Sequence, residues 1–251
     1  MIRTFQKTPR IPRQPARRDK PEMTLDRALS RAGIASRTQA TALIAAGRVQ
    51  VDGRVCRDAQ AWVAPARQRL LLDGHALGQP RRLHWALHKP AGVITSHGDP
   101  RGRKTIYDLS GPQASWYFPV GRLDQDTSGL LLLTNDSLFA ERIASPDHRV
   151  AKTYHARVRP PLTDAALARL GAGLDIGHGE SAAPAPVCRL PRRGPDWIAI
   201  TLREGKNRQV RRMVEAVGSR VEELVRVRIG KLALGTLREG QLRRIRPSDV
   251  I

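Results

Sequence analysis

The stretch from Gly121 to Asp136 constrains the fold of this chain more than any other, because a polar loop in it runs directly into an apolar segment. The loop holds two carboxylates, Asp124 and Asp126, and the segment that follows is Leu130 to Leu133. A short apolar run bounded by turn-forming residues is most simply a buried strand. Functional side chains are often held on a loop that such a rigid element braces. The stretch therefore predicts a buried strand with a functional loop at its start.

The charge of the chain indicates the kind of partner it binds. Lysine and arginine number 44 against 23 aspartate and glutamate, which gives a formal net charge of +21. Net charge informs solubility and partners rather than fold, so a polyanion is the expected partner and nucleic acid is the simplest one. The alternative is a generally basic protein without a special partner. The clustering of the charge described below argues against it.

Several classes of protein are disfavoured by what the sequence lacks. Cys56 and Cys188 lie too far apart for a metal motif or a disulfide framework, which indicates a reducing compartment. The sequence has neither an apolar run of about 18 residues nor an N-terminal signal core. The seven histidines show no metal-ligand spacing, and no dinucleotide fingerprint is present. We therefore expect a cytoplasmic protein that binds no metal and no membrane.

The N-terminal part divides into a basic arm and a small folded unit. Residues 1–22 combine prolines with many basic residues, which predicts a disordered arm that either contacts phosphates or is a solvated tail. Residues 23–75 show helical spacing up to Gly33, a capping box from Ser36, and a strand entering a tight turn at 48–53. This order predicts two helices followed by hairpins in a small α/β unit.

The pattern Gly-x-Val-x-Val-Asp-Gly from Gly47 to Gly53 makes this unit resemble the S4 RNA-binding domain. The resemblance implies that exposed arginines of the unit contact RNA; these are Arg27, Arg31, Arg37 and Arg48. The alternative is a generic small α/β unit.

Residues 76–83 are expected to be a linker, and residues 84–251 one further domain. Candidate strands are 84–88, 92–96, 117–121, 129–134, 150–159, 197–203 and 221–229. Candidate helices are 137–145, 163–171 and 207–217. Partial alternation of apolar and polar residues in 150–159 and 197–203 favours antiparallel pairing with one open face. The fold class predicted for the whole chain is α+β, a small α/β unit followed by a mixed, mainly antiparallel sheet domain.

Three sequence blocks of this second domain resemble those of the RsuA-type ribosomal RNA pseudouridine synthases, and they occur in the family's order. They read Gly-Arg-Leu-Asp-x-Asp-Thr-Ser-Gly-Leu-Leu around Asp124, Lys-x-Tyr ending at Tyr154, and Glu-Gly-Lys-Asn-Arg-Gln-Val-Arg-Arg-Met at 204–213. The resemblance covers residues 23–247. It implies isomerisation of uridine to pseudouridine in ribosomal RNA without a cofactor. A fourth block, His88-Lys89-Pro90-Ala91-Gly92, has histidine where the family usually has asparagine.

The resemblance assigns roles to three residues. Asp124 is the expected catalytic carboxylate, and the neighbouring Arg122 favours its ionised form, which can act as nucleophile or base. It could attack the sugar, attack C6 of the base or remove the C2′ proton, and the sequence leaves these open. Tyr154 is expected to stack on the base and help take the C5 proton. Arg211 is expected to pair with Asp124, with Arg208 or Arg212 as alternatives.

The third block also predicts a phosphate-binding surface, because its basic residues gather where a helix begins. The expected RNA contacts of the catalytic domain are Arg122, Lys206, Arg208 and Arg212. The target base has to leave its stack to reach Asp124, as in other enzymes that act on bases.

Two other functions are alternative interpretations of the sequence. Asp-x-Asp-x also begins a phosphatase signature, but that signature follows an apolar strand, whereas here the apolar run comes after Asp124. An arginine beside a magnesium site would also weaken cation binding. A non-catalytic S4-type RNA-binding protein is the second alternative, and the intact Asp124 and Tyr154 argue against it.

The expected substrate is 23S ribosomal RNA, with 16S ribosomal RNA as the alternative. The loop at 99–105 and the block at 204–213 resemble large-subunit enzymes, whereas the segment around Ser145 leans toward the small-subunit type. Either free RNA or a ribosomal precursor particle fits. The chain is expected to be a monomer.

Overall fold

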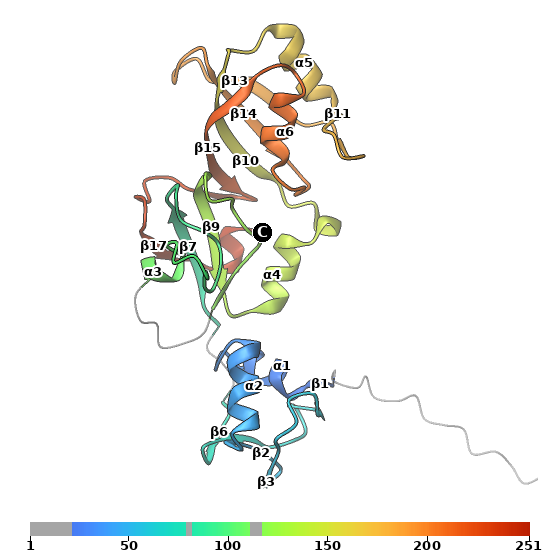
Figure 1. Cartoon of the computed structure of the whole chain (residues 1–251), viewed down its shortest axis with the longest axis vertical. Coiled ribbons are helices and arrows are strands. Elements are labelled where there is room, and N and C mark those ends of the chain that lie inside the picture. Colours follow the sequence, from blue (N-terminus) through green and yellow to red (C-terminus); the bar gives the residue numbers. More distant parts are fainter. Residues whose placement is uncertain (1–21, 79–81, 111–116) are drawn as a thin grey trace, which may run out of the picture. The chain divides into compact units, whose positions relative to one another are not determined.

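A computed structural model of the chain describes residues 22–78, 82–110 and 117–251 (Figure 1). The predicted arm, except its last residue, and residues 79–81 of the predicted linker lie outside this range. The chain divides into two compact units. The first holds the residues up to Gly78 apart from Ser30–Ser36, and the second holds Ser30–Ser36 and Gln79–Ile251.

The first unit contains two helices, a four-stranded sheet and a separate strand pair. Its elements are α1 (Leu25–Arg31), α2 (Arg37–Ala45), β1 (Met23–Thr24), β2 (Val49–Val51), β3 (Arg54–Val55), β4 (Trp62–Val63), β5 (Leu70–Leu72) and β6 (His75–Ala76). The sheet order is β3-β2-β5-β6, and β1 pairs with β4. Asp52 and Gly53 both have positive φ, 50° and 81°, as the two central residues of a tight hairpin turn require.

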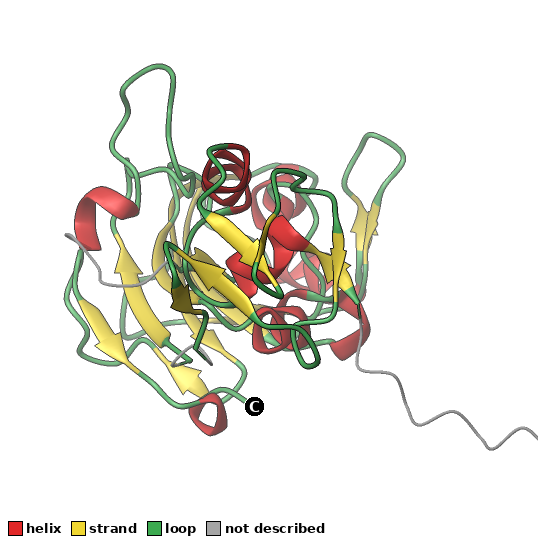
Figure 2. Cartoon of the chain, turned by 90° about the horizontal axis from the view of Figure 1, so that it is seen from below, coloured by secondary structure: helices red, strands yellow, loops and turns green. Residues whose placement is uncertain are grey.

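The second unit is built on one nine-stranded sheet. Its strands are β7 (His84–Lys89), β8 (Phe118–Pro119), β9 (Ser128–Thr134), β10 (Lys152–Arg159), β13 (Val187–Arg189), β14 (Trp197–Leu202), β15 (Arg220–Ile229), β16 (Leu232–Ala233) and β17 (Leu242–Arg244). The main order is β13-β14-β10-β15-β9-β7-β17, with β16 on β15 and β8 on β9. Every pair of neighbouring strands in this sheet is antiparallel except β15 with β9. The predicted α+β class with a mainly antiparallel sheet is confirmed (Figure 2).

Strand β9 is buried on both faces, which explains its uninterrupted apolar run. Leu130 and Leu132 pack in a cluster with residues of α4 (Ser137–Ala144). Leu131 and Leu133 belong to a second cluster with Leu123 from the preceding loop. A strand covered on both sides needs apolar residues at successive positions rather than at alternate ones.

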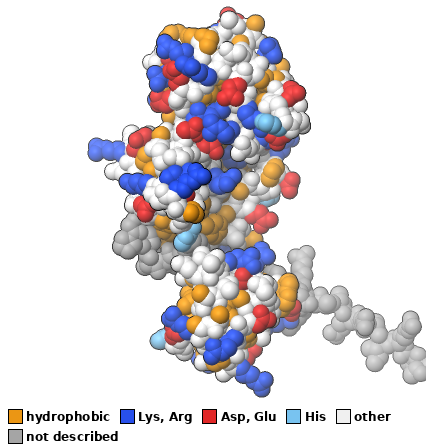
Figure 3. Space-filling view, viewed as in Figure 1, with side chains coloured by type: hydrophobic (Ala, Val, Ile, Leu, Met, Phe, Trp, Pro, Cys, Tyr) orange, Lys and Arg blue, Asp and Glu red, His pale blue; other side chains and the backbone are white. Residues whose placement is uncertain are grey.

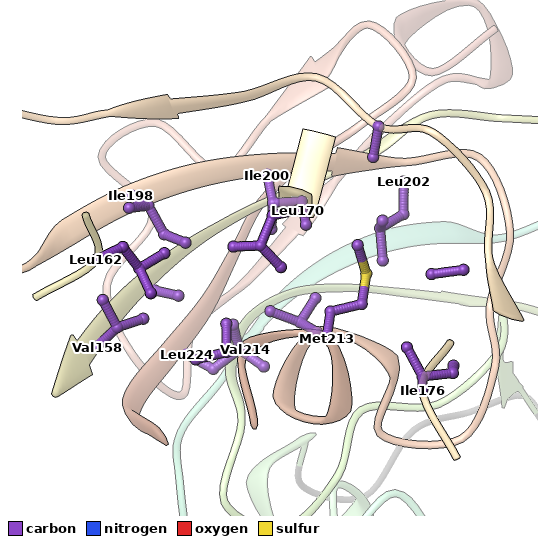
Figure 4. Packing of buried hydrophobic residues seen from close by; sticks show 14 residues of the cluster. Val158, Leu162, Leu170, Ile176, Ile198, Ile200, Leu202, Met213, Val214 and Leu224 are labelled. Carbon is purple, nitrogen blue, oxygen red and sulfur yellow. The ribbon is translucent and has the colours of Figure 1, made fainter. Parts of the chain in front are cut away.

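The other half of the sheet is covered by α5 (Asp164–Ala172) and α6 (Gln209–Glu215). Leu170 of α5 and Met213 and Val214 of α6 pack against Ile198, Ile200 and Leu202 of β14 and Leu224 of β15 (Figure 4). This packing fixes the start of α6 relative to β14 and β15. The remaining helices are α3 (Tyr107–Ser110) and the 3-10 turns Pro146–His148 and Pro247–Asp249, and β11 (Leu174–Asp175) pairs with β12 (Ser181–Ala182).

The strand predicted at 92–96 is wrong. Gly92 has a φ of 87°, and its N–H donates to the Gln125 carbonyl, so this segment folds back onto the Asp124 loop. An isolated bridge between Ile94 and Thr105 is its β pairing. The helix predicted at 207–217 is shorter because Arg208 has a left-handed backbone. Among the described residues, no helix combines the length and apolarity needed to cross a membrane.

Candidate active site

The loop that carries Asp124 lies where the sheet changes from antiparallel to parallel pairing. Ser128 and Gly129, at the start of β9, pair with Val225 and Arg226 of β15. A Cβ atom on Gly129 would lie 2.4 Å from the Arg226 carbonyl oxygen, and the φ of Gly129 is 107°. Glycine at this position therefore permits the close approach of the two strands. The residues just before β9 are brought next to β15.

Hydrogen bonds from the neighbouring segment hold this loop. The Thr95 hydroxyl donates to the Leu123 carbonyl at 2.8 Å and accepts from the Leu123 N–H at 3.2 Å. The Thr127 N–H donates to the Asp124 carbonyl at 3.1 Å, and the Gly92 N–H donates to the Gln125 carbonyl at 2.7 Å. The backbone around Asp124 is thus fixed on both sides.

Lys89 lies beneath the loop and is completely buried. Its ammonium donates to the carbonyls of Val93 at 2.7 Å, Pro90 at 2.8 Å and Gln125 at 3.5 Å. Burial lowers the pKa of Lys89 to about 8, while Asp126 and Asp124 oppose the shift. Lys89 thus links the end of β7 to the Asp124 loop through these hydrogen bonds.

A pocket of about 360 Å³ opens beside the loop. Its walls come from the loop, β10, the end of β14, the start of α6 and β15, and they include Arg122, Asp124, Thr127, Lys152, Tyr154, Lys206, Arg208, Leu224 and Arg226. A pocket of this size, part apolar and part polar, is typical of a small-molecule or nucleoside site. The structure brings Asp124, from the loop before β9, and Tyr154, from β10, to one cavity.

Two arginines of the third block reach the carboxylates of the loop. Arg208 lies 3.9 Å from the Asp124 carboxylate and 3.2 Å from that of Asp126. Arg211 lies 3.1 Å from the Asp126 carboxylate and donates to the Asp126 carbonyl at 3.0 Å and to the Val221 carbonyl at 3.1 Å. The predicted ion pair of Arg211 with Asp124 is absent from the described residues, and Arg208 takes that place.

The start of α6 explains why Arg208, and not Arg211, lies near the Asp124 carboxylate. Arg208 has a φ of 48° and stands just before the helix, which aims its side chain at the loop. Arg211 lies inside the helix and is almost completely buried. Burial lowers the pKa of Arg211, against the attraction of Asp126, whereas the hydrogen bond to Asp126 raises that of Arg208.

The other predicted RNA contacts of this unit differ in how free they are. Arg122 is exposed at the pocket. The Lys206 ammonium donates to the Ser181 carbonyl and lies 3.8 Å from Glu204. Arg212 donates to the carbonyls of Ile176 at 2.9 Å and Gly177 at 2.6 Å and pairs with Glu180 at 2.5 Å. Arg212 thus joins α6 to the loop between β11 and β12.

The arginines predicted to contact RNA in the S4-like part of the chain also differ, because some of them pair with acidic residues. Arg27 is exposed and Arg31 is half-buried. Arg37 pairs with the buried Asp26 at 2.7 Å, and Arg48 pairs with Asp73 at 2.5 Å. Figure 3 shows Lys and Arg side chains on the visible face of each unit.

Thr127, Lys152 and Arg226 are polar residues of the pocket to which the sequence analysis assigns no role. The signal for Arg226 was its alternation with Leu224, which places both on one face of β15. No cluster of three histidine, cysteine or acidic residues in the described ranges is arranged to hold a metal ion.

Comparison with known proteins gives consistent matches for both units. Residues 84–216 match the RNA pseudouridylate synthase family, and residues 23–61 match the S4 domain. The chain is 37% identical over 228 residues to ribosomal large subunit pseudouridine synthase B of Bacillus subtilis, covering 90% of this chain and 93% of that protein. It is 39% identical over 232 residues to an uncharacterized RNA pseudouridine synthase of Mycobacterium tuberculosis, covering 90% of this chain and 91% of the relative.

A solved structure gives the same result in three dimensions. The crystal structure of a pseudouridylate synthase matches with a TM-score of 0.65 and 29% sequence identity. The match covers 90% of this chain and 97% of that one.

Proposed function

The chain belongs to the RNA pseudouridylate synthase family, and from this premise we propose that it converts uridine to pseudouridine in 23S ribosomal RNA, with Asp124 as the catalytic carboxylate. The predictions of this family and of an S4 domain ahead of the catalytic domain are confirmed. The observation that carries the proposal is the pocket in which Asp124 and Tyr154 face one nucleoside-sized cavity.

The proposed reaction breaks the C1′–N1 bond, turns the base within the pocket and joins C5 to C1′. Asp124 is partly exposed to the cavity, and the Arg208 guanidinium lies 3.9 Å from its carboxylate. Tyr154 offers an aromatic face for the base and a phenol that can pass protons. We assign Arg211 to holding Asp126, and through it the Asp124 loop.

The choice of 23S over 16S RNA rests on similarity to a relative, and the choice of RNA as the partner rests on the S4 match and the net charge. The Bacillus subtilis relative is named for the large ribosomal subunit. The S4 match and the net charge of +21 support RNA as the partner. In this proposal Arg27, Arg31, Arg122 and Lys206 contact phosphates, and the chain acts as a monomer on free RNA or on a precursor particle.

The role of Asp124 is tested by replacing it with asparagine. Pseudouridine formation removes the C5 hydrogen, so tritium release from 23S transcripts carrying 5-tritiated uridine measures turnover directly. We expect Asp124→Asn to lower the rate by about a thousandfold or more, because a catalytic group is lost. RNA affinity should change by less than about threefold. Asp147→Asn, on an exposed turn away from the pocket lining, is the matched control.

Two results would overturn this role. One is turnover by Asp124→Asn at the wild-type rate. The other is a loss of RNA binding as large as the loss of turnover, which would make Asp124 a structural residue.

A further inference from the structure

Two basic side chains of the pocket have no acidic partner among the described residues. Arg226 is 3% exposed, and its Nε donates to the Leu130 carbonyl at 2.7 Å. One of its terminal nitrogens, Nη2, is buried and finds no acceptor in the part of the chain that the structure describes. Lys152 is partly buried, and its ammonium forms no ion pair or hydrogen bond with another described residue. Burial, followed by the charge of Arg226, lowers the pKa of Lys152, with no carboxylate acting against the shift.

The register of the sheet places both groups beside Tyr154. Arg226 of β15 lies directly opposite Tyr154 of β10. Lys152 precedes Tyr154 by two residues, so the two share a face of the strand. Thr127, 1% exposed, lines the same cavity, and its hydroxyl has no hydrogen-bond partner within residues 22–78, 82–110 and 117–251. Three polar groups on three elements thus gather at the buried side of one pocket.

Such an arrangement is costly unless a ligand completes it. A buried donor without an acceptor destabilises the folded protein, and a charged one does so more strongly. The nearby carboxylates do not supply the acceptor, because Asp124 lies near Arg208, and Asp126 binds both Arg208 and Arg211. The group that enters the pocket has to bring oxygen atoms that accept these hydrogen bonds.

We infer that Arg226 and Lys152, with Thr127, bind the carbonyl oxygens of the flipped uracil and stabilise the negative charge that develops on the base. This inference rests on the proposed function. When the C1′–N1 bond breaks, its electron pair stays on the uracil and spreads from N1 to O2 and O4. The electron pair that forms the new C5–C1′ bond comes from the uracil ring. The C5 proton then leaves and N1 is protonated, so the isomerisation is balanced without a redox partner.

The burial of Arg226 and Thr127 indicates that their ligand is the base and not a phosphate. Arg122 and Arg208 are exposed, whereas Arg226 and Thr127 are almost completely buried. A flipped nucleotide enters a pocket base first, and its phosphates stay on the strand outside. Arg122, which is exposed at the pocket, is therefore placed for phosphates, and the buried donors for the base. Fixed donors at a site of developing charge typically contribute about a hundredfold to a thousandfold in rate.

The test separates turnover from binding. Single-turnover tritium release from 5-tritiated 23S transcripts is measured at saturating enzyme, and RNA affinity is measured by filter binding. The variants are Arg226→Met, Arg226→Lys, Lys152→Met and Thr127→Val. The control is Arg228→Met on the same strand, whose exposed side chain donates to the Lys231 carbonyl.

We expect Arg226→Met and Lys152→Met each to slow turnover by about a hundredfold with RNA affinity within about threefold of wild type. Arg226→Lys should recover part of the rate, Thr127→Val should cost about tenfold, and Arg228→Met should match wild type. If Arg226→Met does not fold, Lys152→Met and Thr127→Val decide the question.

Folded variants with wild-type rates would overturn the inference while the proposed function stands. Losses of rate matched by equal losses of RNA affinity would overturn it as well. Wild-type protein that is inactive on 23S RNA would instead overturn the proposed function, and the inference with it.

Discussion

At the scale of single residues, Gly129 determines how closely the two halves of the sheet meet. A Cβ at this position would lie 2.4 Å from one backbone atom of Arg226 and 2.6 Å from another, and the φ of 107° disfavours any side chain. We predict that Gly129→Ala lowers the free energy of unfolding by about 3 kcal/mol and strongly reduces turnover. Urea unfolding measures the first effect. Gly98→Ala, at an open position, is the control, and equal stability of the two variants would contradict this account.

The buried Lys89 predicts a pH dependence of stability. Its pKa of about 8 in the folded protein lies below the value of about 10.4 in an unfolded chain. Between these values the unfolded chain holds a proton that the folded chain has lost, so Lys89 makes the free energy of unfolding rise with pH. We expect wild type to gain stability relative to Lys89→Met between about pH 8 and pH 10. Urea unfolding of both proteins across this range would contradict the prediction if their difference stayed constant.

Some of the site was predictable at this scale. Asp124 and Tyr154 stand in blocks that resemble those of the family, and the structure brings both to one pocket. The pairing of the arginines was not predictable, because it depends on the left-handed backbone of Arg208. The gathering of Lys152 and Arg226 depends on the register between β10 and β15, which no local pattern contains.

At the scale of elements, Arg212 joins helix α6 to the loop that follows β11. Its guanidinium donates to two carbonyls of that loop and pairs with Glu180. We predict that Arg212→Met lowers the free energy of unfolding by about 1–3 kcal/mol, because hydrogen bonds from a charged donor are lost. Arg220→Met, at a mostly exposed site, should change it by less than about 0.5 kcal/mol. A stable Arg212→Met protein with weakened RNA binding would instead make Arg212 a phosphate contact.

Elements with a strong local signal were predictable, and edge elements were not. The run Leu130–Leu133 predicted β9 because a strand buried on both faces is apolar throughout. The segment 92–96 contains the apolar pair Val93 and Ile94, but its backbone hydrogen bonds go to the Asp124 loop and to residues around Thr105. The short edge strands β13 and β17 carry no such run, and their pairing depends on neighbours distant in sequence.

At the scale of the whole molecule, the net charge of +21 predicts RNA binding that depends strongly on salt. If about six to ten phosphates are contacted, affinity should fall by about a thousandfold or more between about 50 mM and 200 mM salt. The slope of log affinity against log salt concentration should be lower by about two in the variant that carries both Arg27→Gln and Arg31→Gln, because two phosphate contacts are lost. Arg54→Gln, on an exposed hairpin strand, is the comparison. An affinity that does not change with salt would contradict phosphate binding by the basic surface.

We propose that Asp124 catalyses site-specific isomerisation of uridine in 23S RNA. The decisive experiment maps pseudouridines after incubation with unmodified 16S and 23S transcripts and with partly assembled ribosomal particles. Carbodiimide labelling followed by primer extension locates each pseudouridine as a stop. We expect a new stop in 23S RNA with wild type and none with Asp124→Asn. A stop in 16S RNA would contradict the substrate, and a stop produced equally by Asp124→Asn, or no stop on any RNA or particle, would contradict the mechanism.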